Sequence, residues 1–144
     1  MKFEELQELW DEDSVIDRLD LGNEALKIPK LHSKYYKIYV QEAIRLRKLE
    51  ADYKVLRLEK FEFLTMGPTE ETKDRGWKRP AQSRILKNEA EMYLEADQDL
   101  IQAALKIGAQ KEKTKFLEAI IKEITSRSFH LKIALEYEKF RSGG

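Results

Sequence analysis

Apolar side chains recur at three- and four-residue spacing along most of the chain, which places them on one face of an α-helix. Four such positions predict a short amphipathic helix over residues 2–12: Phe3, Leu6, Leu9 and Trp10. Residues 31–65 contain no glycine or proline and carry a heptad-like seam with one polar position: Leu46, Leu49, Tyr53, Leu56, Lys60 and Phe63. We therefore predict one long helix here, with Pro29 in its first turn.

The pattern is interrupted in the middle of the chain. Four helix-breaking residues predict a linker over residues 66–84: Gly67, Pro68, Gly76 and Pro80. Residues 85–94 fit a short extended segment as well as a helix. Asp97 is a suitable N-cap for a last helix that reaches about Phe140.

The last predicted helix is apolar on two faces. The broader face holds Leu117, Ile120, Ile121, Ile124, Leu131, Ala134 and Leu135, and nearly opposite lie Phe129, Ile133, Tyr137 and Phe140. A helix with two apolar faces needs a partner on each side, and in a chain of 144 residues we expect neighbouring subunits to supply one. We predict nine residues at such contacts: Leu117, Ile120, Ile121, Ile124, Phe129, Leu131, Ile133, Ala134 and Tyr137.

These elements predict an all-α, mostly helical fold whose long helices pack with those of neighbouring subunits. Three parts follow along the chain. Residues 1–65 form a helical part with a basic long helix, residues 66–94 a linker or extended segment, and residues 95–144 a helical oligomerisation part.

The net charge of zero hides segregated charge. Residues 1–20 carry eight acids and two bases, a net charge of −6, whereas residues 27–48 carry seven bases and only Glu42 as an acid, a net charge of +6. Residues 73–87 hold six bases and one acid, and residues 88–105 hold five acids and no base. Such segregation favours polyanion binding, self-association, or both.

Four basic residues of the long helix, together with Gln41, form a stripe about a third of the way around from its apolar seam: Lys34, Lys37, Gln41, Arg45 and Lys48. A second basic group surrounds a tryptophan in the linker, within Arg75-Gly76-Trp77-Lys78-Arg79. Trp77 has two interpretations. It stacks on a nucleobase while its neighbours meet phosphates, or it fixes the loop to a helix.

Catalytic and metal-binding signatures are missing from the sequence. There is no cysteine, no glycine-rich phosphate loop, no nucleophile elbow and no His-x-x-x-His pair, and His32 and His130 lie almost a hundred residues apart. We predict a non-enzyme without metal or cofactor. No apolar run is long enough for a membrane span, and the acidic N-terminus is unlike a signal peptide.

Several segments, in this order and spacing, resemble one family: the UvsY-like recombination mediators of T4-like bacteriophages. The resemblance is carried by Lys2-Phe3-Glu4-Glu5-Leu6-Gln7, Ser33-Lys34 before an aromatic, Leu49-Glu50-Ala51 running into Lys54-Val55, Glu95-Ala96-Asp97-Gln98-Asp99, and Ser126-Arg127-Ser128-Phe129 with Lys132.

The resemblance implies a function without catalysis. Such mediators bind single-stranded DNA, form ring-like homo-oligomers (hexamers or heptamers), and help a RecA-like phage recombinase to displace the phage single-strand binding protein. They act in the cytoplasm of the infected bacterial host. A basic stretch tied to DNA binding in the family corresponds to Arg57–Phe63 here, where Lys60 holds the second basic position, Leu58 holds the first, and Arg57 is a substitute beside it.

We therefore expect ten residues at the DNA-binding surface: Lys34, Lys37, Arg45, Lys48, Arg57, Lys60, Arg75, Trp77, Lys78 and Arg79. We also expect the acidic residues 1–20 to cover part of the basic stripe, so that DNA competes with them. The alternative is a helical structural or adaptor module that self-assembles without binding nucleic acid.

Overall fold

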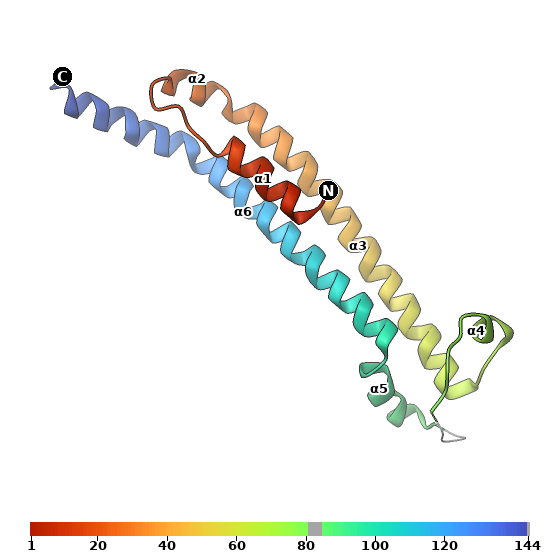
Figure 1. Cartoon of the computed structure of the whole chain (residues 1–144). Helices are drawn as coiled ribbons and strands as arrows, with labels where there is room; N and C mark the ends of the chain where they lie inside the picture. Colours follow the sequence, from red (N-terminus) through yellow and green to blue (C-terminus); the bar gives the residue numbers. More distant parts are fainter. Residues whose placement is uncertain (81–84, 144) are drawn as a thin grey trace. The chain divides into compact units, whose positions relative to one another are not determined.

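A computed structural model describes residues 1–80 and 85–143, and six α-helices occur in these ranges (Figure 1). They are α1 (Phe3–Asp13), α2 (Leu21–Leu26), α3 (Ile28–Met66), α4 (Glu70–Asp74), α5 (Lys87–Glu95) and α6 (Gln98–Arg141). The all-α prediction is confirmed, because the described ranges contain no strand. None of these helices is both long enough and apolar enough to cross a bilayer.

The predicted long helices form close to their expected bounds. Pro29 lies in the first turn of α3, where its missing N–H costs no helical hydrogen bond. Asp97 caps α6 as predicted, because its Oδ2 accepts a hydrogen bond from the backbone N–H of Leu100 at 3.0 Å. Gly67, with a φ of 103°, ends the run of α3 in a conformation that favours glycine.

Of the two possibilities left open for residues 85–94, an extended segment or a helix, the structure has the helix. Residues 87–95 form α5, because helical spacing places Ala90 and Leu94 on one buried face against Leu64 and Leu100. The expected linker over residues 66–84 also contains a short helix, α4. Thr69 caps it, and its Oγ1 accepts a hydrogen bond from the N–H of Thr72 at 3.3 Å.

The chain divides into two compact units. The first joins Met1–Ala43 with Lys111–Gly144, and the second is Ile44–Gln110. The sequence-based division at residues 1–65, 66–94 and 95–144 cuts the chain differently, because each long helix contributes to both units.

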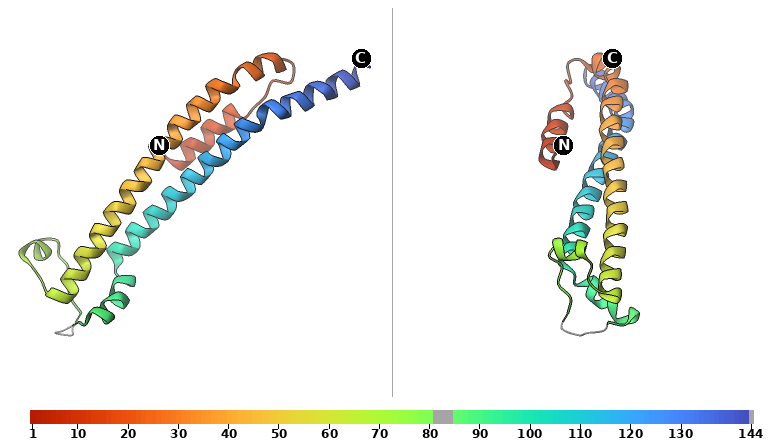
Figure 2. Two further views of the ribbon diagram at one scale, coloured as in Figure 1. Left: turned by 180° about the vertical axis from the view of Figure 1, so that it is seen from behind. Right: turned by 90° about the vertical axis from the view of Figure 1, so that its right-hand side faces the viewer.

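In the first unit, α1 packs against the N-terminal part of α3 and the C-terminal part of α6 (Figures 1 and 2). The core of this unit consists of Leu6, Tyr35, Leu117, Ile120 and Ile124. Three residues expected at subunit contacts therefore lie inside the chain's own core. The helices α1 and α3 already cover that face of α6, so it needs no neighbouring subunit.

The remaining residues expected at subunit contacts divide by exposure. Leu131 is buried, while Ile121 and Ala134 are half-buried. The nearly opposite face of α6 is exposed within this chain, with 63% of Phe129, 48% of Ile133 and 59% of Tyr137 accessible to solvent. That second face of α6 is still an exposed apolar surface, which is the property from which we predicted self-association.

Polar contacts fix both ends of α1. At its end, Asp13 Oδ2 accepts hydrogen bonds from Tyr35 Oη at 2.8 Å and Lys34 Nζ at 2.6 Å. Arg127 donates to the carbonyl oxygen of Ser14 at 3.0 Å. At its start, Lys113 Nζ donates to the carbonyl oxygen of Met1 at 2.6 Å.

These contacts shift two pKa values. Burial raises the pKa of Asp13, but the hydrogen bonds from Lys34 and Tyr35 outweigh burial and leave that pKa below its ordinary 3.8. Burial and the adjacent Asp13 carboxylate raise the pKa of Tyr35 far above its ordinary value, so its hydroxyl stays a donor.

The lowered pKa of Asp13 predicts that part of the stability is lost in acid. At pH values above 3.8 the carboxylate is charged in the folded and unfolded chain, so its stabilisation is complete, and it is lost as pH falls through the lower folded pKa. Near neutral pH, Asp13→Asn should lower the free energy of unfolding by about 1–2 kcal/mol. Urea unfolding followed by circular dichroism should find this gap narrowing below pH 3.8.

Asp11→Asn is the matched control, because Asp11 is an exposed acid of the same helix whose side chain has no hydrogen bond or ion pair among the described residues. Its stability should follow that of the wild type across the titration. A gap between Asp13→Asn and wild type that stays constant in acid would contradict the assignment.

Candidate nucleic-acid interface

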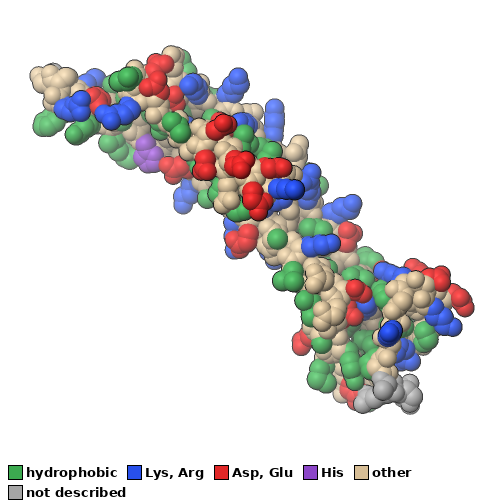
Figure 3. Space-filling view, in the orientation of Figure 1, with side chains coloured by type: hydrophobic (Ala, Val, Ile, Leu, Met, Phe, Trp, Pro, Cys, Tyr) green, Lys and Arg blue, Asp and Glu red, His purple; other side chains and the backbone are tan. Residues whose placement is uncertain are grey.

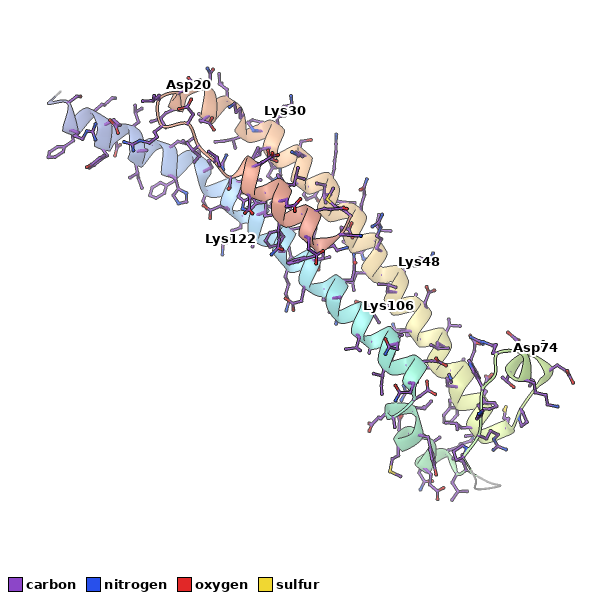
Figure 4. All side chains as sticks on the ribbon, in the orientation of Figure 1. Asp20, Lys30, Lys48, Asp74, Lys106 and Lys122 are labelled. Atoms are coloured by element: carbon purple, nitrogen blue, oxygen red, sulfur yellow. The ribbon has the colours of Figure 1, made fainter. Side chains whose placement is uncertain are left out.

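The outer side of α3 carries the exposed cations of the predicted basic stripe. Lys34 and Lys37 are exposed in the first unit, as is Lys30, which was not among the predicted stripe residues, and Arg45 and Lys48 are exposed in the second. Figure 4 shows Lys30 and Lys48 projecting from α3 into solvent. Within the part of the chain that the structure describes, no ion pair engages Lys37 or Lys48.

The only acid among residues 27–48 does not weaken this cationic surface. Glu42 is 2% exposed, and its carboxylate lies 3.6 Å from the Met1 amino group and 3.5 Å from Lys113 Nζ. A buried carboxylate needs such partners because an unpaired charge is costly to bury. The exposed surface of residues 28–43 on α3 therefore bears bases and no carboxylate.

The acidic residues 1–20, here called the acidic head, contact the stripe at Lys34. Asp13 pairs with Lys34, the first stripe residue. In the space-filling view, carboxylates gather over α1 and basic side chains follow the outer edge of α3 (Figure 3). The charge segregation of the sequence therefore persists at the surface, and Lys37 stays outside the head's ion pairs.

Near the end of α3, basic residues expected at DNA are engaged within the chain. Arg57 pairs with Glu91 of α5, and Arg75 pairs with Glu59 of α3. Arg79 donates a hydrogen bond to the Leu64 carbonyl oxygen at 2.8 Å. In this conformation their charges are partly satisfied before any phosphate arrives.

Lys60 occupies the polar position of the apolar seam and is buried. Only 6% of the residue is exposed, and its Nζ lies 2.6 Å from Asp99 Oδ2 and 3.2 Å from Asp97 Oδ1. The same ammonium group lies 4.0 Å from the centroid of the Trp77 ring, a cation–π distance. Contact between Lys60 and a phosphate requires this cluster to open.

Trp77 fixes the loop to α3 rather than projecting from it. Its ring packs edge-on against buried Phe63, with centroids 5.5 Å apart, and the Arg75 guanidinium lies 4.1 Å from its centroid. Gly76, with a φ of 74°, makes the turn that brings Trp77 back to the helix. Of the basic residues around this ring, Lys78 is exposed and has no ion pair among the described residues.

This arrangement suits charge-based recognition of a flexible polyanion. Lysine and arginine side chains along a helix contact phosphates without reading sequence, and they gain affinity by releasing counterions. In residues 1–80 and 85–143, no group of three His, Asp or Glu side chains is placed to hold a metal ion.

The decisive comparison is with protein-family models, where residues 9–144 match the family described as "Recombination, repair and ssDNA binding protein UvsY". The chain belongs to the UvsY family. The match spans nearly the whole chain, so it includes α3, α6 and the loop between them. The family is one of phage proteins that bind single-stranded DNA in recombination and repair.

Solved structures share the fold. Two crystal structures of the bacteriophage T4 recombination mediator protein UvsY superpose with TM-scores of 0.82 (lattice type IV) and 0.81 (lattice type II). The first is 23% identical and covers 97% of this chain and 99% of that chain, and the second is 22% identical and covers 99% and 98%. No curated protein sequence matches the chain.

The sequence patterns did not predict the polar clusters of this UvsY-family chain. Two of the clusters nevertheless contain a charged residue at an unusual position in the sequence. Glu42 is the single acid in a basic stretch, and Arg127 stands between Ile124 and Leu131 on an apolar face, where it packs over Trp10. Both charged residues are buried in the structure and have polar partners there.

The buried position of Lys60 predicts that its substitution affects stability. Lys60→Ala leaves the Asp97 and Asp99 carboxylates without their shared cation and removes the cation–π contact with Trp77. We expect a loss of about 2 kcal/mol in the free energy of unfolding, below the ~3–5 kcal/mol typical of a fully buried pair, because 58% of the Asp99 side chain is exposed. Urea denaturation measures this loss.

Two variants sharpen that measurement. Lys60→Met keeps the packing without the charge and should lose less stability than Lys60→Ala. Lys48→Ala removes an exposed lysine of the same helix and should change stability by less than about 0.5 kcal/mol. Equal stability of Lys60→Ala and Lys48→Ala would refute the structural role of Lys60.

Proposed function

We propose that the chain is a recombination mediator that helps load a RecA-like phage recombinase onto single-stranded DNA covered by single-strand binding protein. The observation that carries the proposal is the family match over residues 9–144, supported by the cationic surface of residues 28–43 on α3, which exposes no carboxylate. The setting is recombination-dependent replication and repair in the cytoplasm of the infected host.

The exposed basic residues of α3 are proposed to make the primary contact with DNA. Lys37 and Lys48 are available without breaking an ion pair among the described residues, whereas Lys34 must exchange Asp13 for a phosphate. Arg45 lies on the same stripe, and Lys78 adds a base from the loop after α4. Arg57, Lys60, Arg75, Trp77 and Arg79 join the contact only where their intrachain partners are displaced.

A ring-like homo-oligomer, a hexamer or heptamer, is proposed as the binding species. The exposed apolar face of α6, with Phe129, Ile133 and Tyr137, supports self-association, because a large apolar surface left in water is unfavourable. One subunit offers few phosphate contacts, and repetition around a ring multiplies them by avidity.

The same apolar face favours an alternative, a helical adaptor module that self-assembles without nucleic acid. Light scattering on the native protein followed by a gel shift with a labelled single strand separates the two functions. A stable oligomer that leaves the strand unshifted at low salt would support the adaptor and refute the mediator.

The electrostatic model predicts the salt dependence of DNA binding. Each phosphate contact should add ~0.7 to the slope of log affinity against log salt concentration on a single strand. Lys37→Ala and Lys48→Ala should each weaken binding and lower this slope by about 0.7 for every subunit whose lysine contacts the strand. Fluorescence anisotropy of a labelled strand over a range of salt concentrations measures both quantities.

Lys115→Ala is the matched control for these variants. Lys115 is 70% exposed on α6, and Glu112 one turn earlier balances its charge at 3.6 Å. Its removal should leave the slope unchanged. An affinity that ignores salt, or equal losses for Lys115→Ala and Lys37→Ala, would contradict the stripe on α3.

Mediator activity predicts an effect on a recombinase beyond DNA binding. On single strands pre-coated with single-strand binding protein, adding this chain should shorten the lag before a RecA-like recombinase hydrolyses ATP. The Lys37→Ala/Lys48→Ala double variant should restore much of that lag. A wild-type chain that binds the strand yet leaves the lag unchanged would refute loading while preserving DNA binding.

A further inference from the structure

Two exposed aromatic rings lie parallel on the first unit's part of α3. His32 and Tyr36 are one helical turn apart, with centroids separated by 5.9 Å and ring planes inclined by only 10°. This is offset stacking, which aromatic pairs favour over a face-to-face sandwich. About half of Tyr36 is accessible to solvent, and His32 is also exposed.

The neighbouring tyrosines form side-chain hydrogen bonds within the structurally described part of the chain, and Tyr36 does not. Tyr35 is fully buried and its hydroxyl bonds to Asp13, and the Tyr39 hydroxyl donates to Glu118 of α6 at 3.1 Å. Among the described residues, the ring contacts of Tyr36 are with His32 and Tyr39, and its hydroxyl has no hydrogen bond. The fold therefore gains little from an aromatic ring at position 36.

Cations border this aromatic pair. At about 100° per residue, Lys30 and Lys37 fall within roughly 20° of each other on the helix, about 100° around from Tyr36. Both are exposed and without an ion pair in the described ranges, and the small Ser33 and apolar Val40 lie on the surface between them and the ring. Glu42 is buried, so no carboxylate of this part of α3 interrupts the path from the lysines to Tyr36.

We propose that the His32–Tyr36 pair is a stacking platform for nucleobases of single-stranded DNA whose phosphates lie along Lys30 and Lys37. The proposal rests on the proposed function and adds the surface that meets the bases. A strand held by its phosphates at the lysines places unpaired bases over Ser33 and Val40, where the first base extends the stack on Tyr36. A duplex keeps its bases within the helix, so the platform selects single strands.

The charge pattern favours nucleobases over a protein helix as the occupant. An apolar helix would use Tyr36, Val40 and Ile44, but it would also bring its own polar flanks against a cationic rim. Single-stranded DNA matches both parts of the surface, because the phosphates complement the lysines and the base faces complement the rings.

Strands with and without bases test the platform directly. The probes are an oligothymidylate and an oligomer of equal length made of abasic tetrahydrofuran sites, which keeps the phosphates and removes the bases. Tyr36→Ala should weaken anisotropy-detected binding to oligothymidylate by about fivefold or more, the lower end for one stacked base. Binding to the abasic strand should be unchanged. Tyr36→Phe, which keeps the ring, should behave as wild type on both strands.

The outcomes separate the platform from the proposed function. Equal losses on both strands, or no loss on either, would overturn the platform while leaving electrostatic DNA binding intact. A fall in oligomer mass for Tyr36→Ala, measured by light scattering, would also overturn it, because Tyr36 would then belong to a subunit interface. A wild-type chain that binds neither strand would refute the proposed function itself.

Discussion

The register of the apolar seam along α3 decides which of its basic side chains can meet another molecule. Residues on the seam are buried against other helices, and residues well away from it remain in solvent. Lys60 lies on the seam, so Asp97 and Asp99 satisfy its charge. Lys37 and Lys48 lie off the seam and stay exposed. A lysine of α3 is therefore either buried in ion pairs or exposed to solvent, and its position around the helix decides which.

The seam also explains how the surface of the first unit acquires its charge pattern. Tyr35 and Glu42 lie on the buried side of α3, and each needs a polar partner because neither is wholly apolar. The helix α1 supplies Asp13 to Tyr35, and the Met1 amino group together with Lys113 supplies charge to Glu42. Docking of α1 thus completes the core and keeps the one acid of the basic stretch away from the surface.

How much of the structure could be predicted from the sequence depends on how far apart along the chain the interacting residues lie. The bounds of α3 and α6, the position of Pro29 and the cap at Asp97 depend on neighbours within a few residues, and the sequence predicted them. The sequence left residues 85–94 open between a helix and an extended segment, because the two buried positions of α5, Ala90 and Leu94, are defined only by their packing against Leu64 and Leu100. Likewise, Lys60 was visible as a polar residue in an apolar seam, but its partners are 37 and 39 residues away.

Self-association belongs to the proposed mechanism because many basic residues are already paired within the chain. Arg57 pairs with Glu91, Lys60 with Asp97 and Asp99, and Arg75 with Glu59. Each subunit therefore offers only a few exposed lysines of α3 to DNA. A few phosphate contacts are weak at cellular salt concentrations, because the free energy gained by releasing counterions from the strand falls as the salt concentration rises. Linking several such surfaces raises the effective concentration of every later contact without any new contact chemistry. In the proposed mechanism, the exposed apolar face of α6 therefore supplies the repetition of subunits that DNA binding by the cationic face of α3 needs.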